Sequence, residues 1–262
     1  MPAQTSARAG GGASGAEVAM GSVTGGLRWG VDRVLSVGYG LVYDYIFERF
    51  GPYQGLQREV LGLIEASAPD RERRHDVHVI EAGCGPGNFT FLLAEAGFSA
   101  LGLDPYGPVV ELAREKRRAR RLANVAFREG DLAEGAGLRD ASFDQVVSIH
   151  ALYAHPQPQR LLEEAFRVLK RGGHAVLVNH TRQVGFGELT ERDGLAAALR
   201  GSFWVVPNSI FEAARRPVGP HYWDEGVFSA HVRDAGFTVL ETRRTFLHGS
   251  SLLVWARKDT QE

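Results

Sequence analysis

The chain has 262 residues, with 30 lysines and arginines against 31 aspartates and glutamates, and 44% of its residues are hydrophobic. These proportions exclude a collagen, a coiled coil or a disordered chain, and the length favours one large domain. The formal net charge of −1 provides no long-range field for a polyanion, so nucleic acid is not an expected partner. The single cysteine, Cys84, cannot form an intramolecular disulfide, and we expect a reducing compartment, the cytoplasm.

The first 75 residues differ in composition from the rest. Residues 1–26 are rich in glycine, alanine and serine, lack the apolar run of a signal peptide, and are predicted to be a disordered arm. Residues 27–75 are predicted to form a helical lid segment, because large apolar and aromatic residues dominate it with polar or small residues at helical spacing. Within this lid, residues 54–67 form a second amphipathic segment. No run of 18 uncharged apolar residues occurs, which excludes an ordinary membrane-spanning helix.

From residue 76 to residue 262 short β-rich runs alternate with helical stretches. The predicted strands cover 77–82, 99–103, 125–128, 143–149, 174–179, 237–243 and 250–257, and the predicted helices cover 88–96, 107–121, 157–170 and 223–235. This alternation predicts β-α-β units and an α/β fold, with a mainly parallel, doubly wound, Rossmann-like sheet covered on both faces. Residues 181–222 interrupt it with an irregular insertion that contains aromatic residues.

A glycine-rich turn follows the first predicted strand. Gly83, Gly85 and Gly87 lie between that strand and the next helix, and Glu81 comes just before them. Glycines at such a turn let the backbone approach a ligand closely, and the helix N-terminus behind them favours an anion. The spacing departs from the G-x-G-x-x-G pattern of dinucleotide-binding folds.

Two further carboxylates come at strand ends. Asp104 comes at the end of the second predicted strand, where a carboxylate can accept hydrogen bonds from both hydroxyls of a ribose. Asp131 follows the third predicted strand. Asp131 can read an adenine amino group, and Leu132 can pack on the adenine ring. Because the carboxyl ends of parallel strands meet at one edge of a sheet, these groups are expected in one crevice.

Across about residues 76–258 the chain resembles the class I S-adenosylmethionine-dependent methyltransferases. The matching segments are 81–87 (EAGCGPG), Asp104, 130–132 (GDL), 143–148 (FDQVVS) and 167–173 (RVLKRGG). The resemblance implies a seven-stranded sheet with an antiparallel last strand and S-adenosyl-L-methionine as cofactor. It also implies that the glycine turn receives the methionyl part, that Asp104 holds the ribose and that Asp131 contacts the adenine amino group.

The residue pair Tyr43-Asp44 resembles the Tyr-Asp pair of quinone-biosynthesis C-methyltransferases and bacterial phosphatidylethanolamine N-methyltransferases, where the tyrosine lies near the cofactor. The candidate cofactor-binding residues are Tyr43, Glu81, Gly83, Cys84, Gly85, Gly87, Asp104, Pro105, Asp131, Leu132 and Ser148. Cys84 is interpreted as a small buried residue and not as a nucleophile, because no base is evident beside it.

The segments after the fourth and fifth predicted strands carry the candidate catalytic residues. His150 or His180 is the candidate general base, and Tyr153 is the candidate hydroxyl that orients the substrate. A metal site built from these two histidines and His155 is a less favoured alternative, since no ligating carboxylate is evident nearby, and no metal is expected. Packed or solvated histidines without a role in catalysis are the remaining interpretation.

Aromatic residues of the lid segment and the insertion are expected to fold over the sheet edge and form the substrate pocket. The candidate substrate-binding residues are His155, Trp204, Asn208, His221 and Tyr222. The predicted function is therefore methyl transfer to a small aromatic or hydrophobic metabolite, by a monomer or homodimer. One alternative is a lipid-headgroup N-methyltransferase, in which the segment 27–50 would lie at a membrane surface. The polar stripe of that segment, however, lacks the basic residues expected for binding to anionic lipid. Another is a non-catalytic cofactor-binding scaffold.

Overall fold

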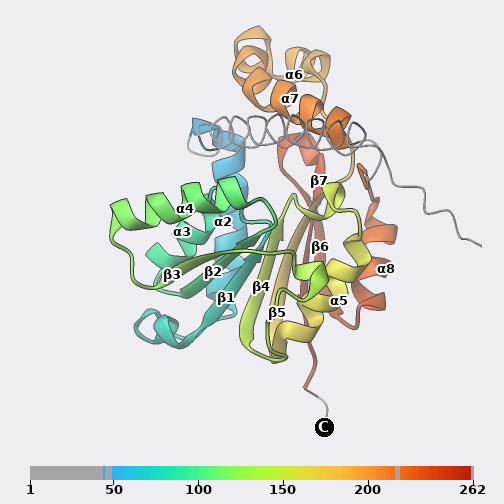
Figure 1. Ribbon diagram of the computed structural model, residues 1–262. Helices are drawn as coiled ribbons and strands as arrows, with labels where there is room; N and C mark the ends of the chain where they lie inside the picture. The colour runs from blue at the N-terminus through green and yellow to red at the C-terminus, as the bar shows by residue number, and fades with distance from the viewer. Residues whose placement is uncertain (1–43, 45–48, 216–218, 261–262) are drawn as a thin grey trace, which may run out of the picture.

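The computed structural model describes residues 44, 49–215 and 219–260, and its centre is a seven-stranded sheet in the order β3-β2-β1-β4-β5-β7-β6 (Figure 1). The predicted disordered arm and most of the predicted lid up to residue 48 lie outside the described residues. The strands are β1 His78–Ala82, β2 Ser99–Asp104, β3 Val125–Glu129, β4 Phe143–Ile149, β5 Leu169–His180, β6 Thr238–Thr245 and β7 Ser251–Arg257.

The strand directions confirm the predicted sheet. β1 pairs in parallel with β2 and β4, β2 with β3, and β4 with β5, whereas β7 runs antiparallel to both β5 and β6. Strand order reverses between β1 and β4, which is the switch point at which open α/β sheets bind ligands beyond the carboxyl ends of their strands. The topology therefore fixes the edge of the sheet at which a site is expected.

Helices cover both faces of the sheet (Figure 1). They are α2 Gly51–Ala66, α3 Asn88–Glu95, α4 Gly107–Arg120, α5 Pro158–Val168, α6 Phe186–Asp193, α7 Leu195–Arg215 and α8 Glu225–Asp234, with 3-10 turns η1 Arg71–Asp76, η2 Leu132–Glu134, η3 Leu152–Ala154 and η4 Leu247–Gly249. Successive strand residues point to opposite faces. Val79 accordingly packs in one core with α2, α3 and α4, and Ile80 packs in a second core with α5 and α8.

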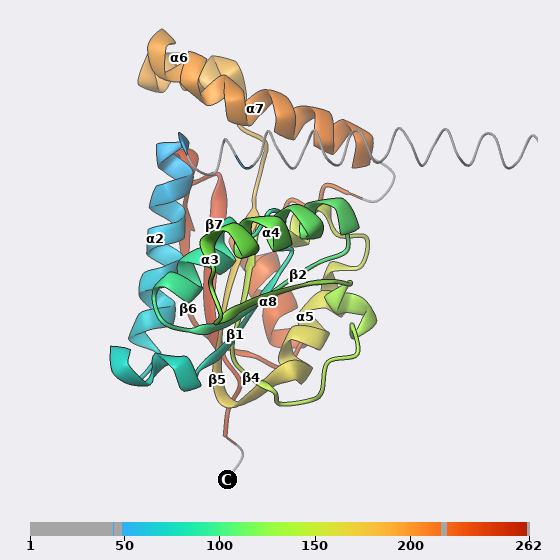
Figure 2. The ribbon, with the colours of Figure 1, turned by 60° about the vertical axis from the view of Figure 1, so that its left-hand side comes forward.

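The insertion after β5 is more regular than the sequence analysis expected. Residues 186–215 form α6 and α7, separated by Gly194 at a φ of 80°. Pro207 lies inside α7, although a proline within a helix lacks the N–H for one backbone hydrogen bond. Figure 2 shows both helices above the edge of the sheet at which β5 ends. Across the described ranges, no helix combines the length and apolar character that a membrane-spanning helix needs.

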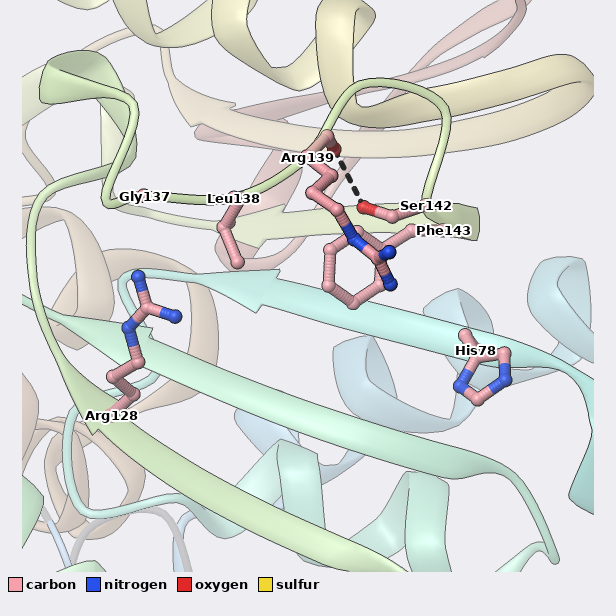
Figure 3. Close-up of a pocket in the computed structure, with 7 residues that line it drawn as sticks. All are labelled: His78, Arg128, Gly137, Leu138, Arg139, Ser142 and Phe143. Atoms are coloured by element: carbon pink, nitrogen blue, oxygen red, sulfur yellow. Dashed lines mark hydrogen bonds between the residues drawn. The ribbon is translucent and has the colours of Figure 1, made fainter.

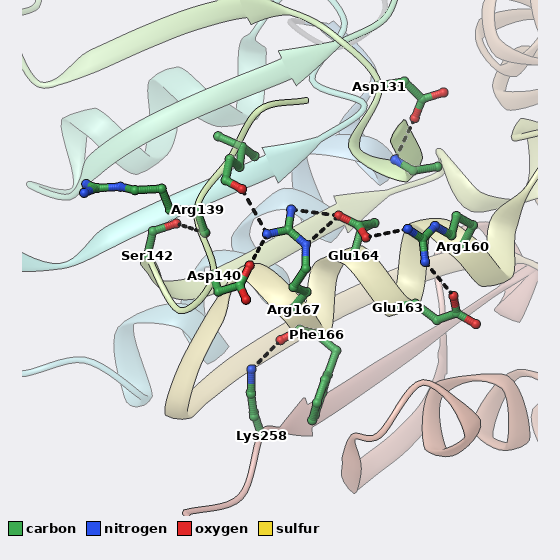
Figure 4. Close-up of polar contacts among 12 residues, drawn as sticks. Asp131, Arg139, Asp140, Ser142, Arg160, Glu163, Glu164, Phe166, Arg167 and Lys258 are labelled. Atoms are coloured by element: carbon green, nitrogen blue, oxygen red, sulfur yellow. Dashed lines mark hydrogen bonds and ion pairs between the residues drawn. The ribbon is translucent and has the colours of Figure 1, made fainter. Parts of the chain in front are cut away.

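An ion-pair network holds the loop that leads into β4 (Figure 4). Arg167 on α5 donates to Glu164 at 2.8 Å, to the carbonyl oxygen of Leu138 at 2.9 Å and to Asp140 at 2.5 Å. The Nζ of Lys258, just after β7, donates to the carbonyl oxygen of Phe166 at 2.8 Å. These bonds fix α5 against the loop before β4 and the end of β7, so the strands that carry the site share one rigid support.

A buried acid joins β1 to α3. Glu81 is only 3% exposed, and its Oε2 accepts a hydrogen bond from the Oγ1 of Thr90 at 2.5 Å. Burial raises the pKa of Glu81 from 4.5 to about 8, the Thr90 hydrogen bond offsets part of that rise, and Asp104 adds to it. The carboxyl group is therefore largely protonated at neutral pH.

This pKa predicts a stability that falls as pH rises. In the unfolded chain the carboxyl of Glu81 loses its proton near pH 4.5, whereas the folded chain keeps it to about pH 8. Between those values the unfolded state binds fewer protons, so its free energy falls relative to the folded state as pH rises. We expect the wild type to lose unfolding free energy relative to Glu81→Gln across this interval, as measured by urea unfolding in steps of about one pH unit. A constant difference between the two proteins would contradict the prediction.

Candidate functional site

The glycine turn after β1 is attached to the end of β2. The backbone N–H groups of Gly83 and Cys84 both donate to the carbonyl oxygen of Leu103, at 2.8 and 3.0 Å. Gly83, Gly85 and Gly87 have φ values of 79°, 51° and 83°, which residues with a side chain rarely adopt. The turn therefore requires glycine and directs its backbone to the carboxyl edge of the sheet.

The three glycines differ in what surrounds them. A Cβ on Gly83 would lie 2.4 Å from the Cβ of Ala151, and one on Gly87 would lie 2.5 Å from the ring of Phe127. These two positions lack side chains because protein packs against them. A Cβ on Gly85 would meet nothing within 4 Å. The open side of the turn is therefore at Gly85, where a ligand can approach the backbone.

Asp104 fastens this turn. The residue is 7% exposed. Its Oδ2 accepts a hydrogen bond from the backbone N–H of Gly85 and its Oδ1 accepts one from that of Tyr106, each at 2.9 Å. A carboxylate has about four lone-pair positions, so further donors such as ribose hydroxyls can still bind. Pro105, which follows, is exposed. The predicted pairing of the glycine turn with Asp104 at one crevice agrees with this geometry.

The other acids of the turn are neutral. Cys84 is 5% exposed, its thiol lies 3.6 Å from the carbonyl oxygen of Gly85, and burial, with smaller effects of Asp104 and Glu81, raises its pKa. A neutral buried thiol fits the interpretation of Cys84 as a small packing residue. Because Glu81 is also largely protonated, the carboxylate charge of Asp104 is the one that a cationic ligand would meet at this turn.

Asp131 and His155 form a pair at the end of β3. Asp131 caps η2 by accepting from the N–H of Ala133 at 2.9 Å, and both its carboxylate oxygens lie 3.0 Å from the Nε2 of His155. The Nδ1 of His155 accepts from the N–H of Gln157 at 2.9 Å, so Nε2 carries the proton and donates to Asp131. The structure thus places His155, predicted as a substrate residue, against a predicted cofactor residue.

Two predicted cofactor residues are enclosed by protein. Leu132 is 2% exposed and packs in the core beneath α5. Ser148 is fully buried in β4, and its Oγ has no hydrogen-bond partner among the described residues. Tyr43 lies outside the described residues. The adjacent Asp44 pairs with Lys116, whose Nζ also donates to Asn88 at the start of α3.

The structure brings His150 and His180 together. His150 follows β4 at a φ of 54°, and its ring stacks on that of His180, the last residue of β5, with centroids 3.8 Å apart and planes inclined by 12°. Burial lowers the pKa of His180 to about 3, and burial together with His180 lowers the pKa of His150 well below 6.5. Both rings are therefore neutral at physiological pH. No cluster of three or more potential ligands among the described residues could hold a metal ion.

Aromatic side chains from four segments surround this pair. Tyr153 of η3 meets the ring of His180 edge-on at 4.8 Å, and Trp204 of α7 lies 5.9 Å from His150. Tyr53 of α2 and Phe246, between β6 and η4, lie 6.1 and 5.1 Å from His150. The sequence analysis did not single out Phe246 for the site, because its place depends on a backbone φ of 55° that no motif announces.

The segment before α8 also reaches the site. The N–H of His221 donates to the carbonyl oxygen of Tyr153 at 2.6 Å, and the Nδ2 of Asn179 donates to the carbonyl oxygen of His221 at 3.1 Å. Tyr222 stacks on Tyr153 at 6.3 Å. Two predicted substrate residues are thus brought beside a predicted catalytic one. The side chain of Asn208, on α7, lies outside the described residues.

A hollow of about 370 Å³ lies elsewhere, between β3 and the loop before β4 (Figure 3). Its lining includes His78 and Phe143, the first residues of β1 and β4, with Arg128 and Arg139. It therefore reaches the amino ends of these strands, away from the glycine turn, Asp104 and the histidine pair. Ligands of open α/β sheets bind beyond the carboxyl ends, so this hollow is not the candidate site.

Comparison with known proteins agrees with the fold and with the position of the glycine turn. Residues 73–202 match the family model described as a methyltransferase domain. A phthiotriol/phenolphthiotriol dimycocerosates methyltransferase of Mycobacterium leprae is 34% identical over 139 residues, 47% of this chain and 49% of the relative. A demethylmenaquinone methyltransferase of Lactococcus lactis is 32% identical over 103 residues, 38% of this chain and 40% of the relative.

The chain spans about half the length of the relatives it matches first. Among solved structures, an S-adenosylmethionine-dependent methyltransferase of Mesorhizobium loti has a TM-score of 0.53 and 21% identity, over 74% of this chain and 95% of that one. That likeness shows the fold. The family match spans the glycine turn, Asp104 and Asp131, and it shows that the chain contains a methyltransferase domain, of the class I S-adenosylmethionine-dependent type.

Proposed function

We propose that the chain transfers a methyl group from S-adenosyl-L-methionine to a small aromatic or hydrophobic acceptor. The observation that carries the proposal is the open backbone at Gly85, whose N–H donates to Asp104. Gly83, on the same turn, packs against Ala151, which follows His150 in the chain. A cofactor held at the turn would thus lie next to the neutral histidine pair. Positioning of donor and acceptor at such a short range is a large part of catalysis for in-line displacement.

The residues at the turn fit the cofactor chemically. When bound, the cofactor supplies a methyl group on a positively charged sulfur. Asp104, already oriented by the N–H groups of Gly85 and Tyr106, would accept from the ribose hydroxyls. Asp131, held by His155, would accept from the adenine amino group. The backbone around Gly85 and the carboxyl of Glu81 would receive the methionyl part, and the aromatic side chains would keep water away from the methyl group.

The residues around the histidine pair suit an acceptor group that must lose a proton when it is methylated. His150 and His180 are neutral, so either can act as general base, and Tyr153 can orient the acceptor. The surrounding rings of Tyr53, Trp204 and Phe246 suit a flat or apolar acceptor. The names of two relatives, acting on phenolphthiotriol dimycocerosates and on demethylmenaquinone, support the hydrophobic acceptor class.

Labelled methyl transfer tests this function. The enzyme would be incubated with S-adenosylmethionine carrying a tritiated methyl group and, separately, with reduced demethylmenaquinone, with sarcosine as a polar acceptor, and with an extract of its own host. We expect the label in an organic-soluble product of the incubation with reduced demethylmenaquinone or with the extract. Absence of label in all three, with cofactor binding intact, would favour the non-catalytic scaffold.

One observation favours a second candidate, methylation of a lipid headgroup at a membrane surface. α7 exposes four large apolar side chains, each more than half exposed: Leu195, Leu199, Val206 and Ile210. Sedimentation with phosphatidylethanolamine vesicles, comparing the wild type with Leu199→Glu and Ile210→Glu, tests it. Absence of the wild type from the pellet would remove this candidate.

Removing the carboxylate of Asp104 is predicted to weaken cofactor binding. Asp104→Ala loses charge-assisted hydrogen bonds worth about 1.5 to 3 kcal/mol, so Kd for S-adenosylmethionine, measured by calorimetric titration, should rise by about 10- to 150-fold. Asp144→Ala is the control, because Asp144 makes comparable bonds to His78 and Lys170 at the opposite edge of the sheet. Equal affinities of Asp104→Ala and the wild type would remove Asp104 from the site.

A methyl group added at Gly85 is predicted to block the cofactor. Gly85→Ala places its Cβ in the open space beside the turn, at a strained φ that costs about 1 to 3 kcal/mol of stability. Gly62→Ala is the control, since Gly62 also has open space but lies in α2. In calorimetric titration, Kd for S-adenosylmethionine should rise by at least about tenfold in Gly85→Ala and stay unchanged in Gly62→Ala. Full affinity of a folded Gly85→Ala would place the ligand elsewhere.

The histidine pair is predicted to affect turnover and not cofactor affinity. His150→Gln and His180→Gln remove the candidate base, so kcat in the labelled transfer assay should fall by about 10²- to 10⁴-fold, while Kd for the cofactor stays within about twofold. Wild-type kcat in both variants would show that neither ring is the base.

A further inference from the structure

Three side chains from three neighbouring strands meet at the carboxyl edge of the sheet. His150 follows β4, His180 ends β5, and Ser251 begins β7, where it pairs directly with His180 in the β5–β7 register. The Oγ of Ser251 lies 2.9 Å from the Nε2 of His150 and 3.0 Å from the Nδ1 of His180. Ser251 was not singled out by any sequence motif, and it bridges the two stacked rings.

The single proton of a hydroxyl restricts this bridge. The Ser251 Oγ–H can donate to one imidazole nitrogen only, and the oxygen must then accept from an N–H of the other ring. If it donates to the Nδ1 of His180, both neutral rings carry their proton on Nε2. If it donates to the Nε2 of His150, both rings carry it on Nδ1. The two histidines must therefore always share the same tautomer.

The ring nitrogen of each histidine that faces away from Ser251, its outer nitrogen, lacks a hydrogen-bond partner among the described residues. The Nδ1 of His150 and the Nε2 of His180 are buried and have no hydrogen-bond partner within the ranges that the structure describes. In either tautomer one of these nitrogens is bare and the other carries a proton. His150 is also held at a φ of 54°, a conformation that side-chain-bearing residues adopt where the surrounding structure imposes it. Unsatisfied buried nitrogens and a strained backbone at one place point to a function.

We propose that His150, Ser251 and His180 form a proton relay that removes the acceptor's proton without storing it, an inference that rests on the proposed function. As the acceptor's electron pair forms the bond to the methyl carbon, the carbon–sulfur bond breaks with its electron pair going to sulfur. The acceptor's proton binds the bare outer nitrogen of one ring. That ring's inner proton passes to Ser251, the Ser251 proton passes to the inner nitrogen of the other ring, and the second outer nitrogen gives its proton to water. Between turnovers the same transfers run in reverse: water donates a proton to the second outer nitrogen, the first outer nitrogen releases its proton to water, and the first tautomer is restored.

The relay solves a problem of charge. A lone base that kept the proton would become a buried imidazolium against a second ring 3.8 Å away, in surroundings that already lower the pKa of both histidines. After the relay both rings are neutral again and have exchanged one shared tautomer for the other. Ser251 acts here as a positioning residue, since it conducts the proton without meeting the acceptor.

Nitrogen NMR of the imidazole rings tests the coupling without any substrate. In ¹⁵N-labelled protein, long-range ¹H–¹⁵N correlation distinguishes protonated from bare ring nitrogens, and His150→Gln and His180→Gln spectra assign the signals. We expect the same fraction of the Nε2–H form in both wild-type rings. Different fractions in the wild type would overturn the relay.

Substitutions at two adjacent serines separate the relay from simple packing. Ser251→Ala should let the two tautomer fractions diverge, and Ser251→Thr should keep them equal because the hydroxyl remains. Ser250→Ala is the matched control: Ser250 is also fully buried, and its Oγ has no partner among the residues described. Equal fractions that persist in Ser251→Ala would show that Ser251 does not couple the rings.

Kinetics distinguish failure of the relay from failure of the proposed function. In the labelled transfer assay Ser251→Ala should lower kcat by at least about tenfold with cofactor Kd unchanged, and Ser251→Thr should restore it. Wild-type kcat in Ser251→Ala, while both histidine variants are impaired, would refute the relay and leave the base in place. Wild-type kcat in the histidine variants would instead refute the base in the proposed function, and the relay with it.

Discussion

The pair of hydrogen bonds from the N–H groups of Gly85 and Tyr106 to the carboxylate of Asp104 is the interaction on which the site depends. It joins the end of β2 to the turn after β1, beside the switch point between β1 and β4. The turn can form only because three positions adopt positive φ without a side chain, and two of them are packed against Ala151 and Phe127. The contact at Gly83 places the turn against Ala151, the residue that follows His150.

Charge in this cleft is kept low by burial. Glu81, Cys84, His150 and His180 all titrate in directions that favour their neutral forms, because each is removed from water. Asp104 differs in that its carboxylate accepts hydrogen bonds from two backbone N–H groups. A ligand with a positive sulfur would thus meet one carboxylate among neutral polar groups, and an acceptor would meet two uncharged imidazoles.

The sequence predicted the parts of the molecule that local chemistry determines. The glycine turn, Asp104 at the end of β2 and the parallel alternation have short-range signals, and the sheet order confirms the predicted fold. Local signals failed where tertiary packing decides. Residues 186–215 are helical despite Gly194 and Pro207. Ser251 reaches the histidines because β7 is inserted between β5 and β6, a long-range pairing that no window of sequence records.

That insertion of β7 has a consequence for how the protein is made. β7 is the last strand along the chain, but it hydrogen-bonds to β5 on one side and to β6 on the other. While the polypeptide leaves the ribosome, the outer edge of β5 therefore stays without its partner after every earlier strand has emerged. β5 gains this partner only after β6 has been made, and until then the nascent chain presents an unpaired edge on which a chaperone can act.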